Sequence, residues 1–229
     1  MIELGPPEMA FARGGNRLCY VDPRDDRRCI KVLRQDHDPA WRRARKRFPK
    51  NMRSLSSFDD NLQEFQVYEK VARFIGEPAW QVASRCYGFV DTTQGKGLCS
   101  ELIRDDNGLI AISLKQYVWE YGITKELSES VSCFSLLWRQ LGMPSRNLLL
   151  HNIVVQRAKG AITRLVVIDG LGWAGAMPLA YWLQPLARYR AGRKIQSLYR
   201  GIEQLLDKKK READYGYHGW LTEEQRRSG

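Results

Sequence analysis

Three residues of this chain carry side chains that suit a metal ion and phosphate groups. Asn152 lies in the segment SRNLLLHNIVV, and Asp169 lies in LVVIDGLG, one short hairpin later. An amide oxygen and a carboxylate are hard ligands that Mg²⁺ accepts alongside water and phosphate oxygens. Lys31, in RRCIKVLR, adds a positive charge that can neutralise phosphate oxygens. Together these residue types predict a site for a metal-nucleotide complex.

Asn147, five residues before Asn152, bears on what such a site can do. Protein kinases carry an Asp at this spacing, where it accepts the proton of the attacking hydroxyl. An Asn side chain cannot accept that proton as a carboxylate does. The sequence therefore predicts the groups that hold ATP without the usual catalytic base.

The elements expected to position Lys31 are two strands near the N-terminus. Residues 9–21 (MAFARGGNRLCYV) and 27–34 (RRCIKVLR) are rich in β-forming residues and flank the charged turn DPRDD. Gly14 and Gly15 lie at the bend of the first strand, where missing side chains let backbone amides approach a phosphate. An ordinary turn explains the same two glycines, so both interpretations stay open here.

A helix is predicted in SFDDNLQEFQVYEKVARFIG, with Ser57 or Asp59 as its cap. Its apolar positions recur at helical spacing: Leu62, Phe65, Val67, Val71, Phe74 and Ile75. Either Glu64 or Glu69 can point at Lys31 if this helix packs on the sheet, and we take Glu64 as the partner. Such an ion pair keeps the ammonium group aimed at phosphates. A solvated surface position is the alternative for any single helical glutamate.

Two further strands are predicted in WQVASRCYGFVDTTQGKGLCSELI, around the turn TTQGKG. Glu101, near the end of the second strand, is a further candidate for cofactor binding. A polar joint follows at residues 104–108, and we place the lobe boundary there. Residues 1–104 then form an N-lobe of sheet plus one helix, and residues 105–229 form a helical C-lobe, within one domain overall.

The second part of the chain is mainly helical, with one hairpin. Helices are predicted in SLKQYVWEY and in KELSESVSCFSLLWRQLG, the latter ended by Gly142 and Pro144. LLLHNIVVQ and ITRLVVIDG predict a hairpin around AKG, with Asn152 and Asp169 at its two ends and facing one cleft. PLAYWLQPLARYR and RKIQSLYRGIEQLLDKKKREADYG predict two helices, followed by a frayed polar end after Gly216.

Composition bounds the class of protein. With 229 residues and 43% hydrophobic content, the chain is long enough for one domain of two lobes. Lys+Arg 37 against Asp+Glu 26 gives a net charge of +11, which favours acidic partners such as nucleotides, nucleic acid or anionic lipid. Five widely spaced cysteines without a CxxC pair support neither a disulfide framework nor a zinc site. Without an apolar run of signal-peptide or membrane-spanning length, we expect a cytoplasmic protein with no transmembrane segment.

A basic run, WRRARKRFPKNMR, occupies residues 41–53. Most runs of this kind are solvated loops. The alternative is an anionic surface as partner: lipid headgroups, sugar phosphates, or RNA held by nonspecific phosphate contacts. No motif that reads specific nucleic-acid sequences occurs in the chain.

Five segments together resemble a known bacterial family: GGNRLCYVDPRDDRRCIKV, EFQVYEKV, YGFVDTTQGKGL, HNIVV and VVIDGLG. They are similar to the YrbL, or PhoP regulatory network protein, family over roughly residues 9–190. That family is itself similar to protein kinases. The resemblance implies an α+β, two-lobed protein-kinase-like fold, with a small antiparallel sheet and one helix in the N-lobe and a mostly helical C-lobe, and it implies ATP binding.

The chain departs from active kinases in its loop motifs. Ser145, Arg146 and Asn147 stand where kinases have His-Arg-Asp, and the metal-binding acid begins DGLG with no Ala-Pro-Glu sequence after it. Phosphoryl transfer depends mainly on positioning and charge neutralisation, so loss of the base slows the reaction rather than abolishing it. An activation segment that binds a protein substrate is not expected from this sequence.

Three functions remain open from the sequence. The first is a kinase-like phosphotransferase acting on a small molecule or glycan with ATP and Mg²⁺, using Lys31, Glu64, Asn152 and Asp169; nucleotidyl transfer is its variant. The second is a pseudokinase-type regulator that binds a nucleotide or a protein partner without catalysis, as Asn147 suggests. The third is an adaptor that binds an anionic surface or nucleic acid through residues 41–53.

Overall fold

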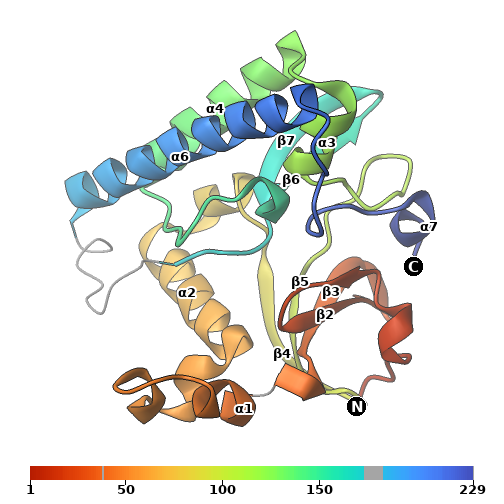
Figure 1. The fold of residues 1–229 in the computed structure, drawn as a ribbon, viewed down its shortest axis with the longest axis vertical. Helices are drawn as coiled ribbons and strands as arrows, with labels where there is room; N and C mark the ends of the chain where they lie inside the picture. Colours follow the sequence, from red (N-terminus) through yellow and green to blue (C-terminus); the bar gives the residue numbers. More distant parts are fainter. Residues whose placement is uncertain (38, 173–182, 229) are drawn as a thin grey trace. The chain divides into compact units, whose positions relative to one another are not determined.

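The computed structural model describes residues 1–37, 39–172 and 183–228. Within it the chain divides into two compact units. The first comprises Met1–Val67 and Arg85–Leu102 together with Ser228, and the second comprises Tyr68–Ser84 and Ile103–Arg227. Figure 1 shows the sheet strands of the first unit and the long helices of the second.

The first unit is built on a five-stranded antiparallel sheet in the order β1-β2-β3-β5-β4. Its strands are β1 (Ala12–Arg13), β2 (Arg17–Asp22), β3 (Asp25–Leu33), β4 (Cys86–Thr92) and β5 (Gly95–Glu101). The strand predicted across residues 9–21 is in fact two strands, β1 and β2, because the chain reverses at Gly14 and Gly15. Gly14 N donates to Arg17 O at 2.8 Å, which closes that reversal.

Alternation along β2 and β3 sets which side chains are buried on each face. One face carries a core cluster made of Ile2, Leu4, Leu18, Tyr20, Ile30 and Val32. Lys31 lies between Ile30 and Val32 and therefore points to the opposite face. It pairs with Cys19 on β2 and with Leu98 on β5, so Lys31 stands in the middle of the sheet.

The helices of the first unit follow β3. They are α1 (Pro39–Ala44) and α2 (Asp60–Phe74), which continues past Val67 into the second unit. Short 3-10 turns at Lys50–Met52 and Leu55–Phe58 lie between them. Of the two predicted caps of α2, Asp59 is the one observed, since its Oδ1 accepts from Leu62 N at 2.9 Å.

The buried face of α2 differs from the predicted apolar stripe. Asn61, Glu64, Tyr68 and Val71 are buried, whereas Phe74 is 36% exposed. The polar residues turn inward because Asn61 Nδ2 donates to Lys31 O on β3 at 2.8 Å and Glu64 binds the Lys31 side chain. Hydrogen bonds to the sheet therefore set the rotation of this helix, as well as its apolar side chains.

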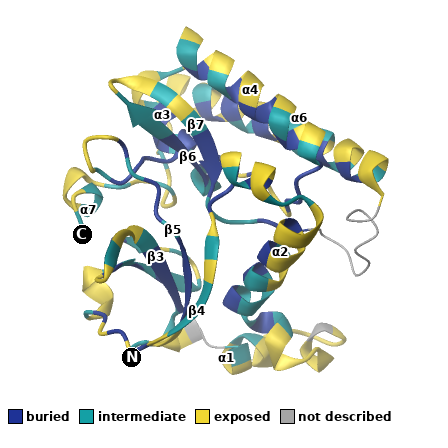
Figure 2. Ribbon diagram, turned by 180° about the vertical axis from the view of Figure 1, so that it is seen from behind, coloured by how far each residue is buried: buried dark blue, intermediate teal, exposed yellow. Residues whose placement is uncertain are grey.

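The second unit is mainly helical and contains one hairpin. Its elements are α3 (Leu114–Tyr121), α4 (Lys125–Leu141), β6 (Ile153–Ala158), β7 (Ala161–Val167), α6 (Gln184–Lys210) and α7 (Glu223–Arg226). Ser113 and Thr124 cap α3 and α4 through their hydroxyls, and Gly142 ends α4 in the left-handed conformation. Helices α4 and α6 run side by side in Figures 1 and 2, with their buried faces in dark blue in the second.

The last long helix differs from the prediction. Residues 184–210 form one continuous helix rather than two; the predicted segment 178–182 lies outside the described residues. Gly192 is tolerated inside α6 where it faces Arg139 of α4: a Cβ added there would lie 3.7 Å from the Arg139 side chain.

The segment after Gly216 is docked on the second unit rather than frayed. Ser113 Oγ donates to Gly219 O at 2.5 Å, and Leu221 N donates to Gln116 Oε1 at 2.9 Å. Polar composition predicted a loose end here, but the polar groups of this segment find partners on α3.

The fold class is α+β, as predicted: an antiparallel five-stranded sheet followed by a helical part with one hairpin, in the element order of a two-lobed protein-kinase-like fold. None of the helices in the described part of the chain combines the length and the apolar character that crossing a membrane requires.

Candidate functional site

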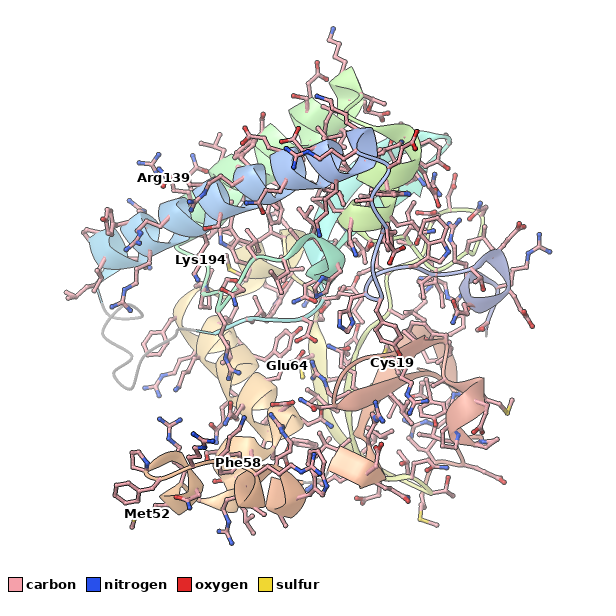
Figure 3. The ribbon with its side chains drawn as sticks, viewed as in Figure 1. Cys19, Met52, Phe58, Glu64, Arg139 and Lys194 are labelled. Atoms are coloured by element: carbon pink, nitrogen blue, oxygen red, sulfur yellow. The ribbon has the colours of Figure 1, made fainter. Side chains whose placement is uncertain are left out.

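The sheet of the first unit holds Lys31 in an ion pair with the predicted glutamate. Lys31 Nζ lies 2.8 Å from Glu64 Oε1 of α2, and each residue is only 6% exposed. Glu69, the alternative partner, is exposed on the same helix. Figure 3 labels Glu64 on α2.

Glu64 binds a second cation that sequence reasoning missed. Arg17 Nη1 contacts the other carboxylate oxygen, Oε2, and also donates to Asn61 Oδ1 at 3.4 Å. The formal charges of Arg17, Lys31 and Glu64 sum to +1, two cations against one anion. Burying charges costs several kcal/mol per ion, on the order of what their pairing returns. Two cations therefore share one buried carboxylate, Arg17 on Oε2 and Lys31 on Oε1.

The start of α2 is tied to neighbouring segments through Asp60. Asp60 Oδ2 accepts from Asn16 Nδ2 at 3.0 Å and pairs with Arg42 Nη1 at 2.9 Å. Arg42 belongs to the basic run and lies on α1. Arg42 and Arg45 therefore have partners, Asp60 and the Trp41 ring, while Arg43 and Arg47 are exposed.

The glycine pair lies where β1 turns into β2. Neither Gly14 nor Gly15 has a positive φ, and a Cβ added at Gly15 would meet nothing within 4 Å. Protein packing therefore does not require glycine at position 15. Close approach of a ligand to the backbone is one reason for an absent side chain here.

Glu101 lies at the end of β5 and is half-buried. Its Oε2 accepts from Arg85 N at 3.1 Å, while Arg85 O accepts from Glu101 N at 2.8 Å. These bonds join the end of β5 to the residue before β4. The predicted role of Glu101 in cofactor binding stays a prediction.

The predicted metal-binding pair lies at the two ends of the β6-β7 hairpin. Asn152 precedes β6 in a 3-10 turn, and its carbonyl accepts from Ile168 N at 2.9 Å, directly before Asp169. Asp169 Oδ1 accepts from Gly170 N at 2.6 Å. The hairpin register places the amide and the carboxylate at neighbouring backbone positions, as the sequence predicted.

Gly170 brings the three sequence-predicted residues of this unit together. Its φ is +82°, and a Cβ added to it would lie 3.0 Å from Asn152 Nδ2 and 3.2 Å from Asn147 O. Arg146 N also donates to Gly170 O at 3.0 Å. The loop that carries Asn147 is therefore bonded directly to the DGLG segment, and only glycine fits at the point of contact.

Lys194, on α6, reaches the same loop. Its Nζ donates to Arg146 O and lies 3.4 Å from Asn147 Oδ1. Sequence reasoning missed this residue because Lys194 is 47 positions from Asn147 and one of many basic residues on a helix. Only the packing of α6 shows that this lysine lies beside the position of the usual catalytic base.

His151 lies next to Asn152 and stacks on a residue of the C-terminal segment. Its ring centroid is 5.5 Å from that of His218. Burial lowers the pKa of His151, and the neighbouring His218 and Lys115 lower it further, while Asp169 acts in the opposite sense. Burial therefore disfavours the charged form of His151, which lies beside Asn152.

Asn152 and Asp169 are too few ligands for a metal ion that protein groups alone would hold, but two protein oxygens are enough for Mg²⁺. Within the described residues, no group of three or more His, Cys, Asp or Glu is placed to hold a metal ion. Asn152 and Asp169 supply one amide and one carboxylate. Mg²⁺ commonly takes one or two protein oxygens and completes its octahedron with water and phosphate.

Lys31 and Glu64 belong to the first unit, and Asn147, Asn152 and Asp169 belong to the second. Within its unit, Lys31 pairs with Glu64, and Asn147 and Asn152 both lie against Gly170. Arg17 contacts the Lys31–Glu64 pair, and Lys194 contacts Asn147; the sequence did not predict either residue.

Comparison with known proteins matches most of the chain. The family model described as "PhoP regulatory network protein YrbL" matches residues 5–203. The YrbL proteins of Escherichia coli (strain K12) and Shigella flexneri are each 24% identical over 172 residues, covering 74% of this chain and 73% of the relative. Their names state no reaction or substrate. The resemblance that the motifs indicated is confirmed, and the chain belongs to the PhoP regulatory network protein YrbL family.

Proposed function

We propose that this protein binds Mg-ATP and transfers a phosphoryl group to a small molecule or glycan. The observation that carries the proposal is the buried ion pair between Lys31 and Glu64, 2.8 Å apart. Replacing a buried pair by apolar residues is often neutral or stabilising, so such a pair is weak support for a purely structural role. A lysine held by a helix glutamate is the arrangement that kinase-like sites use for nucleotide phosphates.

Lys31 would contact phosphate oxygens, with Glu64 holding its ammonium group in place. Arg17 on the second oxygen of Glu64 limits how far that carboxylate cancels the charge of Lys31. The backbone at Gly14 and Gly15 would approach the phosphates, and Glu101 would contact another part of the nucleotide. Lys31, Gly14, Gly15 and Glu101 are thus the proposed contacts to the nucleotide.

Asn152 and Asp169 would hold the metal ion. Mg²⁺ bound there would neutralise charge on the phosphates during transfer. Gly170 keeps the Asn152 amide close to the DGLG backbone, which orients it without a further side chain. Phosphoryl transfer requires positioning and neutralisation more than covalent chemistry, so these contacts supply most of what the step needs.

A noncatalytic regulator is the second candidate, favoured by Asn147. The amide at this position cannot take a proton from a hydroxyl acceptor. In that case the protein would bind nucleotide and show no turnover. The two candidates share the nucleotide site and differ only in chemistry.

Thermal unfolding with increasing Mg-ATP tests the nucleotide site, because a ligand that binds the folded state raises the melting temperature. We expect a dose-dependent rise in the wild type and its loss in Lys31→Met and Asp169→Ala. Lys96→Met is the matched control, since Lys96 is an exposed lysine of the same sheet. Equal shifts in all four proteins would show that Lys31 and Asp169 do not bind the nucleotide. A shift without ADP formation would favour the noncatalytic regulator.

A further inference from the structure

One cation, Lys194, lies beside the Asn147 side chain. Lys194 Nζ lies 3.4 Å from Asn147 Oδ1 and also binds the carbonyl of Arg146, whose side chain is on the exposed part of the same loop. Figure 3 labels Lys194 on α6. Where a kinase has a carboxylate that accepts a proton, this chain has a neutral amide and an ammonium group.

The charge extends along α6. Arg190 precedes Lys194 by one helical turn and shares its face, and Arg193 is its immediate neighbour. No Asp or Glu occurs between Gln184 and Ile202. The charged residues of this part of the helix are therefore all basic, and positive charge of this kind favours an anion.

A base is needed only when the acceptor must lose a proton. A hydroxyl has to be deprotonated as it attacks phosphorus, but a carboxylate or a phosphate is already an oxyanion near neutral pH. Lysine binds such oxyanions through charge-assisted hydrogen bonds. The exchange of Asp for Asn, with a lysine beside it, fits an acceptor that arrives deprotonated.

We propose that Lys194 binds the acceptor and that its attacking atom is an oxygen of a carboxylate or phosphate group. This inference rests on the proposed phosphotransferase function and names the acceptor class. The acceptor oxygen forms a bond to the γ-phosphorus of ATP as the bond from that phosphorus to the β-γ bridging oxygen breaks. The electron pair of the broken bond leaves on ADP, and no proton is transferred.

Asn147 positions this acceptor. Its amide can donate a hydrogen bond to an oxyanion, whereas an Asp would repel it. Asn147→Asp therefore has opposite effects for the two classes of acceptor. It supplies a base for a hydroxyl and places a like charge beside a carboxylate or phosphate.

Phosphate binding tests the site without nucleotide. Inorganic phosphate is titrated into Lys31→Met protein, which lacks the nucleotide lysine, and into the same protein carrying a second change. We expect Lys194→Ala to weaken phosphate binding by about tenfold, the loss of roughly one charge-assisted hydrogen bond. Lys194→Arg should largely restore it. Lys208→Ala, about 21 Å along the helix at 1.5 Å per residue, should leave it unchanged.

Turnover tests the role of the site. ADP formation from Mg-ATP is measured with inorganic phosphate, acetate and glycerol 1-phosphate, and with glycerol and glucose as neutral acceptors. Stimulation by an oxyanion, lowered in Lys194→Ala and in Asn147→Asp, supports the proposal. Stimulation by the neutral acceptors alone, a faster Asn147→Asp enzyme, or no oxyanion effect in a protein that binds ATP overturns it.

These outcomes separate the two proposals. If Mg-ATP does not bind, the proposed function fails whatever Lys194 does. If Mg-ATP binds and phosphate binding is the same in Lys194→Ala as in its parent, only the acceptor site fails. A merely structural lysine would change stability through its bond to the Arg146 carbonyl and leave phosphate affinity unchanged.

Discussion

At the scale of single residues, Glu64 forms two buried ion pairs in the first unit. One carboxylate holds two cations, Lys31 on Oε1 and Arg17 on Oε2, and all three are mostly buried. The residues are not equivalent, because removing the anion leaves two like charges close together. Removing one cation leaves an ordinary pair.

Glu64→Gln should therefore destabilise the protein more than Lys31→Met. Breaking a buried pair by removing one partner costs about 3–5 kcal/mol, and Glu64→Gln lies at the upper end because two cations lose their anion. Lys31→Met keeps the bond between Arg17 and Glu64. Urea unfolding of the two variants measures the difference, and an equal or reversed order of stabilities would contradict this account of the cluster.

Gly170 and Gly15 make a second comparison between single residues. Gly170→Ala places a methyl 3.0 Å from the Asn152 amide at a φ of +82°, and should cost about 1–3 kcal/mol. Gly15→Ala enters open space and should leave stability nearly unchanged. Chemical unfolding checks both. Gly15→Ala should still weaken Mg-ATP binding, and unaltered affinity would remove Gly15 from the proposed site.

His151 predicts how stability depends on pH. Burial lowers the pKa of the folded His151 below that of the unfolded chain, so the unfolded state binds more protons in mild acid. The contribution is present above the unfolded pKa of about 6.5 and is lost as pH falls below it. Between pH 7 and pH 5, His151→Gln should flatten the decline in unfolding free energy; an unchanged slope would show that other groups cause it.

At the scale of elements, the C-terminal segment is an integral part of the second unit. Arg226 of α7 binds Asp105 Oδ2 at 3.0 Å, next to the bond that Arg157 makes with the same buried carboxylate. Arg226 Nε also donates to Ile110 O at 2.8 Å. Asp105, placed by sequence in a polar joint, is therefore an anchor for two distant segments.

Arg226→Ala should destabilise the protein by about 1–3 kcal/mol, because the buried Asp105 loses a charged hydrogen bond. Its neighbour Arg227 pairs with exposed Glu223 one turn away, and such surface pairs contribute about 0–1 kcal/mol. Thermal unfolding of the two alanine variants is the measurement. Similar melting temperatures for both would mean that α7 is not held by Asp105.

The sequence predicted the elements better than their contacts. The charged turn DPRDD, the cap at Asp59 and the glycine stop at position 142 are local signals. The continuity of α6 through Gly192 and the inward rotation of Asn61 and Glu64 on α2 depend on neighbours far along the chain. Local sequence patterns cannot predict contacts with residues far along the chain.

At the scale of the whole molecule, local sequence patterns predicted some residues of the candidate site and missed others. Lys31, Asn152 and Asp169 were predicted from sequence because each lies in a segment with recognisable spacing, and Glu64 was chosen from two helical glutamates. Arg17 and Lys194 were not predicted, since tertiary packing alone selects them from 37 basic residues. The net charge of +11 favours anionic ligands in general and does not locate a binding site on the molecule.

The proposed function requires that Mg-ATP binding depends on both Lys31 and Asp169. Calorimetric titration of ATP, with Mg²⁺ and again with EDTA, tests it most directly in the wild type, Lys31→Met, Asp169→Ala and Lys96→Met. We predict that Mg²⁺ strengthens ATP binding in the wild type and Lys96→Met and has little effect in Asp169→Ala. Lys31→Met should weaken binding by about 10–100-fold, the loss of a charged hydrogen bond. Equal affinity in all four proteins, with or without Mg²⁺, would contradict the account.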